Sequence, residues 1–427
     1  MRVRRERRGT ASAQAGRFPG GGAPRPARAL VAGVAGPHNG DVHVCHVITR
    51  LIVGGAQENT LLTCEGLHAR GHRVTLISGP TRGPEGSLVE RARQGGYEYI
   101  EIPELIRAVN PWLDTRAVRL LRAEFARLRP DVIHTHSSKA GIVGRYAARR
   151  LRGAVVVHTI HGMSFNRTQP WPVRWVFAAL ERRAACWTDA LIGVAEAMLR
   201  QSLAHGIGRP DRMHLVYSGM ELEPFTPGRY DRAAVRAGWG VPPDAVVVAT
   251  VARLFRRKGY EQLLPIMSRA AARDPRLRFV WIGDGAQRAE YEAELDRRGL
   301  RERTSLAGLV PPAEVPRLLA GCDILAHTSQ WEGLPRAVVQ ALLMQVPAVA
   351  FDIDGTPEVV HDGRTGRLIR LNDLDAFADA VCALAADPAQ RAAMGAAGRA
   401  LCVTRFDWRQ MVDRLEALYG RLVAARN

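Results

Sequence analysis

The sequence has almost no lysine. Its only lysines are Lys139 and Lys258, and arginine supplies the remaining 58 of its 60 basic residues. With 41 glycines and 25 prolines in 427 residues, this bias indicates a GC-rich coding preference rather than a selected property. The two lysines stand out from that background, so each is a candidate for a specific role.

Long apolar runs and paired cysteines are absent as well. No run of 18 apolar residues occurs, so we expect no membrane-spanning helix, and the segment 29–36 is too short and too rich in glycine for a signal peptide. The six cysteines form no C-x-x-C pair, which is typical of a reducing compartment and predicts that each thiol is buried. We therefore expect a cytoplasmic protein.

Motifs of nucleic-acid-binding proteins are missing too, although the net charge is +18. Residues 1–40 carry a net charge of +7, and residues 116–183 hold 14 basic but only three acidic residues, so the rest of the chain is neutral in sum. This distribution favours a basic surface for an anionic membrane or a phosphorylated substrate. We therefore expect no nucleic-acid partner, and nucleic-acid binding remains an alternative that rests on charge alone.

Short apolar strands alternate with helical patterns along most of the chain. Strands are predicted at 42–48, 73–78, 97–102, 131–134, 155–160 and 190–194, and again at 245–251, 277–282, 323–326 and 347–351. This alternation predicts an α/β fold of two doubly wound, Rossmann-like domains with parallel sheets. Such sheets bind ligands at the carboxyl ends of their strands, so we expect the site in a cleft between the domains.

Composition divides the chain further. We predict a disordered basic extension at 1–40, an N-terminal domain at 41–222, a linker at 223–244, a C-terminal domain at 245–406, and a final helix at 407–427 that packs back towards the N-terminal domain.

Two motifs place candidate binding residues after predicted strands. Arg253 and Lys258 follow the strand 245–251, where cations beside the start of a helix form a site for a diphosphate; a solvated basic loop is the alternative. Glu332 and Gly333 precede an apolar helix. Glu332 either binds sugar hydroxyls or only complements the helix dipole, and Gly333 leaves backbone N–H groups free to meet a phosphate.

Histidines end two other strands. His134 and His136 close one strand, and His158 and His161 lie at the end of another, so together they resemble a metal cluster. Because no carboxylate ligand accompanies them, we interpret them as hydrogen-bonded structural residues and expect no metal. The Asp352-Ile353-Asp354 triplet ends a buried strand, and we discount it as a Mg²⁺ site.

Four segments in register resemble the GT-B glycosyltransferases of family 4, and the resemblance runs from about residue 42 to the C-terminus. They are Ala252-Arg-Leu-Phe-Arg-Arg-Lys-Gly259, Ile282-Gly-Asp-Gly285, Ser329-Gln-Trp-Glu-Gly-Leu-Pro335 and Gly355-Thr-Pro-Glu-Val-Val-His-Asp-Gly-Arg-Thr-Gly366. The family is retaining and uses nucleotide sugars. The segment 134–145 also resembles a subgroup associated with bacterial surface-polysaccharide assembly.

The resemblance implies roles for individual residues. The implied catalytic residues are Glu332 on the transferred sugar, Lys258 and Arg253 on the donor diphosphate, and His161 near the reacting centre. The implied contacts to the nucleotide sugar are Gly54, Gly55, Arg253, Lys258, Gly333, Leu334 and Gln340. The two glycines would approach the diphosphate from the acceptor-side, N-terminal domain.

One position departs from the family pattern. The second glutamate of the family's E-x₇-E motif, which typically holds the nucleotide ribose, is Gln340 in this sequence. Glutamine still pairs with a hydroxyl but lacks the charge-assisted part of the hydrogen bond, about 1 kcal/mol. The departure therefore concerns the nucleotide contact and not the sugar contact of Glu332.

The resemblance thus implies a retaining hexosyltransferase acting on a glycan or lipid-linked acceptor in cell-surface polysaccharide biosynthesis. Its co-substrate would be a nucleotide-diphosphate sugar, a UDP-sugar in preference to a GDP-sugar, with no cofactor and no metal, because fixed cations stabilise the departing diphosphate. A sugar-nucleotide 2-epimerase, which needs no acceptor, and a non-catalytic sugar-nucleotide-binding protein remain alternatives.

The basic block at 116–183 allows two interpretations. Arginines alternate with apolar residues along 112–129, and Trp171 and Trp175 flank Arg174. Two core-facing helices with solvated outer faces account for this pattern. Peripheral docking on the anionic inner face of the cell membrane, which would bring the protein to a lipid-linked acceptor, accounts for it as well.

Overall fold

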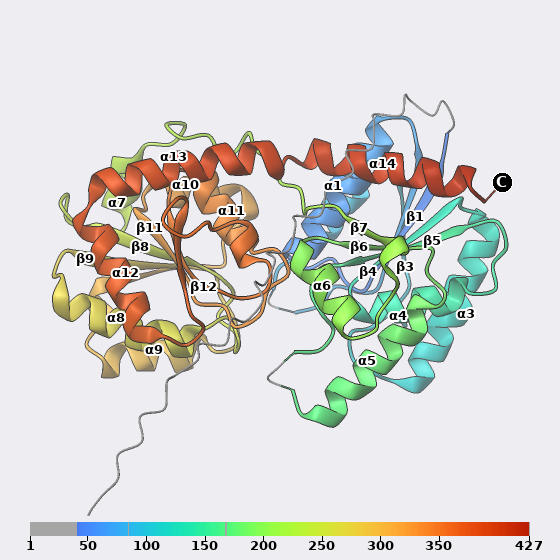
Figure 1. Cartoon of the computed structure of the whole chain (residues 1–427), viewed down its shortest axis with the longest axis horizontal. Helices are drawn as coiled ribbons and strands as arrows, with labels where there is room; N and C mark the ends of the chain where they lie inside the picture. The colour runs from blue at the N-terminus through green and yellow to red at the C-terminus, as the bar shows by residue number, and fades with distance from the viewer. Residues whose placement is uncertain (1–40, 84, 167–168, 427) are drawn as a thin grey trace, which may run out of the picture. The chain divides into compact units, whose positions relative to one another are not determined.

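Two parallel β-sheets organise the chain in a computed structural model, which describes residues 41–83, 85–166 and 169–426. The first sheet has the order β3-β2-β1-β4-β5-β6-β7 and the second the order β10-β9-β8-β11-β12-β13. Figure 1 labels most of these strands. The strands of the first are β1 (His43–Ile48), β2 (Arg73–Ser78), β3 (Glu98–Glu101), β4 (Val132–His136), β5 (Val155–Ile160), β6 (Ala190–Gly193) and β7 (Met213–Leu215). Those of the second are β8 (Val246–Val251), β9 (Leu277–Ile282), β10 (Thr304–Gly308), β11 (Ile324–His327), β12 (Ala348–Phe351) and β13 (Gly366–Ile369).

Helices connect the strands and cover both sheets. In the first half they are α1 (Gly55–Ala69), α2 (Val89–Gln94), α3 (Pro111–Leu128), α4 (Ser138–Ala148), α5 (Trp171–Ala185) and α6 (Glu196–Ala204). In the second half they are α7 (Arg232–Gly238), α8 (Tyr260–Arg273), α9 (Arg288–Arg297), α10 (Val315–Ala320), α11 (Arg336–Leu343), α12 (Leu374–Ala386), α13 (Pro388–Arg405) and α14 (Trp408–Ala424). Among the described residues, no helix is long and apolar enough to cross a membrane.

Local sequence explains where several of these helices begin. The side chain of Asn110 accepts hydrogen bonds from the first backbone N–H groups of α3. Asp373, Asp387 and Asp407 do the same for α12, α13 and α14. Asparagine and aspartate are favoured at this position because their side chains satisfy N–H groups that have no partner inside the helix.

The strand pattern confirms the predicted α/β fold of two Rossmann-like units. Each predicted strand is present to within two residues, and every strand pairing is parallel. Three strands were not predicted: β7, β10 and β13. The stretch predicted as a linker contains α7, in which Arg236 forms an ion pair with Asp323 beside the second sheet. The predicted extension at 1–40 lies outside the described residues.

One prediction about the cysteines is wrong. The thiol of Cys186 is exposed, because Cys186 caps the carboxyl end of α5 on the protein surface, and Cys382 is only partly buried. The other four cysteines are buried, as expected for small apolar residues in a core.

The last helix of the chain packs against the first sheet. Its buried residues recur with helical spacing, which places them on one face. They are Met411, Val412, Leu415, Leu418 and Tyr419, and they join the apolar cluster that contains Val44 of β1 and Leu61 of α1. Figure 1 shows α14 beside α1. The C-terminal helix therefore belongs to the core of the first half.

We predict that Leu415→Ala destabilises the protein by about 2–5 kcal/mol, because it leaves a cavity between α14 and the first sheet. Chemical denaturation followed by circular dichroism measures the change. Arg414→Ala, at the exposed neighbouring position, is the matched control and is expected to be close to neutral. Equal stability of the two variants would contradict this packing.

Candidate functional site

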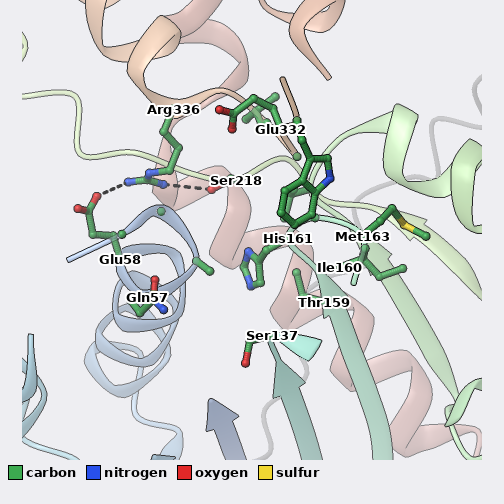
Figure 2. Close-up of a pocket in the computed structure, with 18 of the residues that line it drawn as sticks. Gln57, Glu58, Ser137, Thr159, Ile160, His161, Met163, Ser218, Glu332 and Arg336 are labelled. Atoms are coloured by element: carbon green, nitrogen blue, oxygen red, sulfur yellow. Dashed lines mark hydrogen bonds and ion pairs between the residues drawn. The ribbon is translucent and has the colours of Figure 1, made fainter. Parts of the chain in front are cut away.

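The carboxyl ends of the two sheets face one cavity of about 520 Å³. One side is formed by the segments after β1, β5 and β6, and the other by the segments after β8 and β11 and by the start of α11 (Figure 2). Every site residue predicted from the sequence lines this cavity. They are Gly54, Gly55, His161, Arg253, Lys258, Glu332, Gly333, Leu334 and Gln340. The fold thus brings them together, while their individual roles stay predictions.

Glu332 and Lys258 form an ion pair on the second-sheet side of the cavity. The Lys258 Nζ atom lies 2.7 Å from Glu332 Oε1, and His327 Nε2 lies 3.4 Å from the same oxygen. Burial alone would raise the pKa of Glu332, but the charge of Lys258 and the proximity of His327 outweigh it and hold the pKa well below its ordinary value. Glu332 is therefore a charged carboxylate in a largely buried position.

A glycine lets Lys258 reach this position. Gly259 precedes α8 with φ +81°, a conformation that favours glycine. A Cβ at this residue would lie 1.7 Å from the backbone oxygen of Thr328, which directly follows β11. Only glycine therefore allows the start of α8 to lie so close to the end of β11. Glu332 lies in the segment that follows β11, so this approach brings Lys258 near it.

Asp354 positions Glu332 through a hydrogen bond to its backbone. Its Oδ2 accepts the backbone N–H of Glu332 at 2.8 Å, and its Oδ1 accepts the side-chain N–H of Gln201 at 2.8 Å. The second aspartate of the triplet that we discounted as a metal site thus connects Glu332 to α6 of the first half. Its sequence context at a strand end gave no indication of this contact.

The backbones of the two halves touch between Gly333 and His161. A Cβ at position 333 would lie 2.0 Å from the backbone oxygen of His161, so no larger residue fits without moving one of the two segments. His161 itself follows β5 and lines the cavity. This contact places Glu332 and His161 on facing sides of the same small space.

Arg253 lies at the edge of the cavity in a group of three charges. Its Nη1 is 3.7 Å from Glu85 Oε1, and Arg50 Nη2 is 3.5 Å from the same oxygen. Burial lowers the pKa of Arg253, and the negative charge of Glu85 offsets this only in part. One carboxylate thus faces two guanidinium groups, and an anionic ligand would compete with that carboxylate for them.

Arg336 is a site residue that the sequence reasoning missed. At the start of α11, its guanidinium pairs with Glu58 of α1 at 2.7 Å and donates to Oγ of Ser218 at 3.1 Å (Figure 2). It also donates to the backbone oxygen of Gly219 at 2.8 Å. Its side chain lies against Gly55, where a Cβ would be 2.4 Å from Arg336 Cδ. Arg336 directly follows the motif at 329–335, but its partner Glu58 is 278 residues away, and no local pattern reveals that pair.

The histidines at the strand ends are buried. His134 and His136 belong to β4, and His158 belongs to β5. Side-chain nitrogens of His134, His136 and His46 lie within 4.8 Å of one another, a grouping with the ligand number of a metal site. However, both ring nitrogens of His134 already form hydrogen bonds, as our structural interpretation predicts. The expectation of no metal stays a prediction.

Comparison with known proteins identifies the family. Residues 53–224 match the family model "Glycosyltransferase Family 4", and residues 231–401 match the model "Glycosyl transferases group 1". Alpha-maltose-1-phosphate synthase of Mycolicibacterium smegmatis is 30% identical over 312 residues, which cover 69% of this chain and 79% of that protein. The chain belongs to the family 4 glycosyltransferases. This confirms the predicted family and the prediction that the protein is a transferase.

Other relatives and solved structures agree with this family. A UDP-Gal:alpha-D-GlcNAc-diphosphoundecaprenol alpha-1,3-galactosyltransferase of Escherichia coli is 27% identical over 391 residues, which cover 90% of this chain and 97% of that enzyme. Anabaena HepE in complex with UDP and glucose matches with a TM-score of 0.75 at 20% identity, over 89% of this chain and all of that one. Sucrose-phosphate synthase from Thermosynechococcus elongatus matches with a TM-score of 0.74 at 21% identity, over 90% of this chain and 100% of that one. The transferase therefore has the GT-B fold, as predicted.

We predict that Gly333→Ala destabilises the transferase by about 1–3 kcal/mol and lowers its turnover about 100-fold, because the added Cβ pushes Glu332 and His161 apart. Gly162→Ala is the matched control at the same cavity, since its Cβ would meet Trp331 at 3.4 Å, an ordinary contact. Denaturation and turnover of both variants check the prediction. Normal turnover in Gly333→Ala would show that the backbone contact does not set the site geometry.

Proposed function

We propose that the protein is a retaining glycosyltransferase that transfers a hexose from a UDP-sugar to a glycan or lipid-linked acceptor in cell-surface polysaccharide biosynthesis. The observation that carries this proposal is the pairing of Lys258 with the buried carboxylate of Glu332 beside Arg253 in one cavity. Cations suit a departing diphosphate, and a charged carboxylate suits the hydroxyls of the transferred sugar.

The proposed reaction proceeds with retention of configuration. The bond from the sugar C1 to the diphosphate oxygen breaks, and the acceptor hydroxyl forms its new bond to C1 on the same face. The acceptor's proton moves to the departing diphosphate oxygen. Positive charge develops on the sugar ring and negative charge on the diphosphate, so Arg253 and Lys258 would stabilise the transition state without a metal ion.

Two similarities support the choice of substrates. The Escherichia coli relative is named for a UDP-Gal donor and a diphosphoundecaprenol-linked acceptor, and its match covers nearly the whole of both chains. The Anabaena structure contains UDP and glucose. We therefore place a UDP-hexose ahead of a GDP-hexose as donor and a lipid-linked sugar ahead of a free glycan as acceptor.

We predict that Lys258→Ala and Glu332→Ala each reduce hexose transfer at least about 100-fold, because each removes charge that the transition state uses. Transfer is measured with UDP-hexoses in EDTA, and a thermal-shift panel of UDP, GDP and ADP sugars selects the donor, since a bound ligand raises apparent stability. Both variants should remain folded by circular dichroism.

The other lysine supplies the matched control. Lys139 pairs with Asp114, donates to the backbone oxygen of Ala108 at 3.0 Å, and is not among the lining residues of the cavity. Lys139→Ala should therefore transfer hexose at the wild-type rate. Full activity in Lys258→Ala, or transfer that EDTA abolishes, would contradict the proposed chemistry.

We further propose that the protein docks on an anionic membrane through α3 and α5. Trp171 and Trp175 are 76% and 63% exposed on α5, next to Arg174, and Trp112 is 71% exposed at the start of α3. Exposed tryptophans flanked by arginines suit the boundary between lipid headgroups and acyl chains. A membrane-bound position would bring the cavity to a lipid-linked acceptor.

We predict that the protein co-sediments with vesicles containing anionic lipid at low salt and less at high salt, because arginine contacts to headgroups are screened. The double variant Trp171→Ala, Trp175→Ala should lose most of this binding. Val403→Ala, which removes an exposed apolar side chain from α13, is the control. No sedimentation of the wild type at low salt would refute the docking surface.

A further inference from the structure

Hydrogen bonds connect three histidines from the cavity into the first sheet. His161 lines the cavity (Figure 2), and its Nε2 lies 3.0 Å from Nδ1 of His136 at the end of β4. Nε2 of His136 lies 2.9 Å from Nδ1 of His46 in β1, the strand beside β4. We call these three residues the histidine chain. His136 and His46 are buried, so the chain leads away from solvent.

The two ends of the histidine chain differ. Nε2 of His46 is buried and has no hydrogen-bond partner within the described residues. At the other end, His161 already uses its Nε2, and among the described residues no hydrogen bond engages its Nδ1. Because His161 lines the cavity, a ligand can approach this residue while His46 stays inaccessible.

Metal binding is the first alternative for these residues, since His46, His134 and His136 lie close together. Nδ1 of His134 lies 2.5 Å from the hydroxyl of Tyr419, and its Nε2 lies 2.7 Å from the hydroxyl of Thr159. Both ring nitrogens of His136 form hydrogen bonds within the histidine chain, to His46 and His161. A metal would have to break several of these bonds inside a buried sheet, so the geometry favours hydrogen bonding.

Each ring of the histidine chain carries one proton on nitrogen. Burial lowers the pKa of His46 to about 3. Burial, with a contribution from the charge of Arg336, also lowers the pKa of His161 to about 3. Burial and the neighbouring histidines hold the pKa of His136 well below its ordinary value. A neutral imidazole has one donor and one acceptor, so both hydrogen bonds can form only if all N–H groups point the same way along the chain.

The buried end distinguishes the two possible directions. If the N–H groups point inward, Nε2 of His46 carries a proton that has no acceptor. If they point towards the cavity, that atom is a bare acceptor, His136 donates to Nε2 of His161, and His161 carries its own proton on Nδ1. Buried donors without a partner are rarer in proteins than buried acceptors without one, which favours the second direction.

We propose that His136 and His46 are positioning residues that keep the proton of His161 on Nδ1, so that His161 offers a hydrogen-bond donor to an oxygen of the bound substrate. This inference rests on the proposed function, because it concerns the same cavity. Without His136, the proton of His161 distributes over both ring nitrogens. The fraction with the proton on Nε2 then presents a lone pair where the substrate oxygen needs a donor.

The proton position can be measured without substrate. Nitrogen NMR of the full chain with ¹⁵N-labelled histidine distinguishes the two neutral forms of each ring, and His161→Gln identifies the signals of His161. We expect the proton on Nδ1 in the wild type and a mixture in His136→Leu. His43→Leu is the matched control, because His43 is a buried histidine of β1 that forms a hydrogen bond with Thr75 and not with the histidine chain. A proton on Nε2 of His161 in the wild type would overturn the proposal.

Kinetics then test the consequence. His136→Leu should lower kcat roughly 10- to 100-fold with little change in KM for the donor, as for other residues that orient a reacting group. His136→Asn should recover at least part of that loss, since its amide nitrogen occupies the place of Nδ1 and donates to His161. His43→Leu should keep the wild-type kcat. An unchanged kcat in His136→Leu, or no recovery in His136→Asn, would contradict the proposal. So would one equivalent of zinc bound to the wild-type protein and lost in His46→Leu.

Failure of the proposed function gives a different result. If the wild type transfers no sugar from any nucleotide sugar, the proposed function is wrong, and the NMR measurement still decides where the proton of His161 lies.

Discussion

The site depends on one close approach, that of the Gly333 backbone to the carbonyl oxygen of His161. A Cβ at position 333 would lie 2.0 Å from that oxygen, so at this point the backbones of the two loops are in direct contact. Two side-chain contacts support the approach from either side. Arg336 reaches Glu58 of α1, and Glu358 accepts the backbone N–H groups of Glu196 and Ala197 at the start of α6, at 2.8 and 2.9 Å. The cavity is therefore a property of residues 41–426 as a whole and not of either sheet alone.

Most of the strands that could be predicted are buried on both faces, and the three that were missed are all edge strands. β5 and β9 have mostly apolar sequences, and their predicted bounds coincide with those of the structure. β7, β10 and β13 all lie at sheet edges and are at most partly buried along much of their length, so their sequences mix polar and apolar residues. An edge strand leaves one side without a partner strand and gives a weaker apolar pattern, and of the four edge strands only β3 was predicted.

The site could be predicted as a set of residues but not as a network. Residues such as Lys258 and Glu332 follow strands, and the rule that parallel sheets bind ligands at their carboxyl ends brings them together before any coordinates are known. The residues that orient them are different. Asp354 acts on the backbone of Glu332, and His136, at the end of β4, acts on the ring of His161. Such contacts depend on strand order and on the meeting of two sheets, which no local pattern contains.

The ion pair of Lys258 and Glu332 also couples binding of the diphosphate to binding of the sugar in the proposed donor. Glu332 is largely buried, and an unpaired buried charge costs several kcal/mol, so its carboxylate needs a partner in every state of the site. If a diphosphate draws Lys258 away, the carboxylate loses its main partner, and hydroxyl groups of an attached sugar can replace it. A nucleotide without a sugar supplies no such donors and leaves Glu332 less well compensated. With the proposed donor, the pair would therefore favour binding of the intact nucleotide sugar over the free nucleotide.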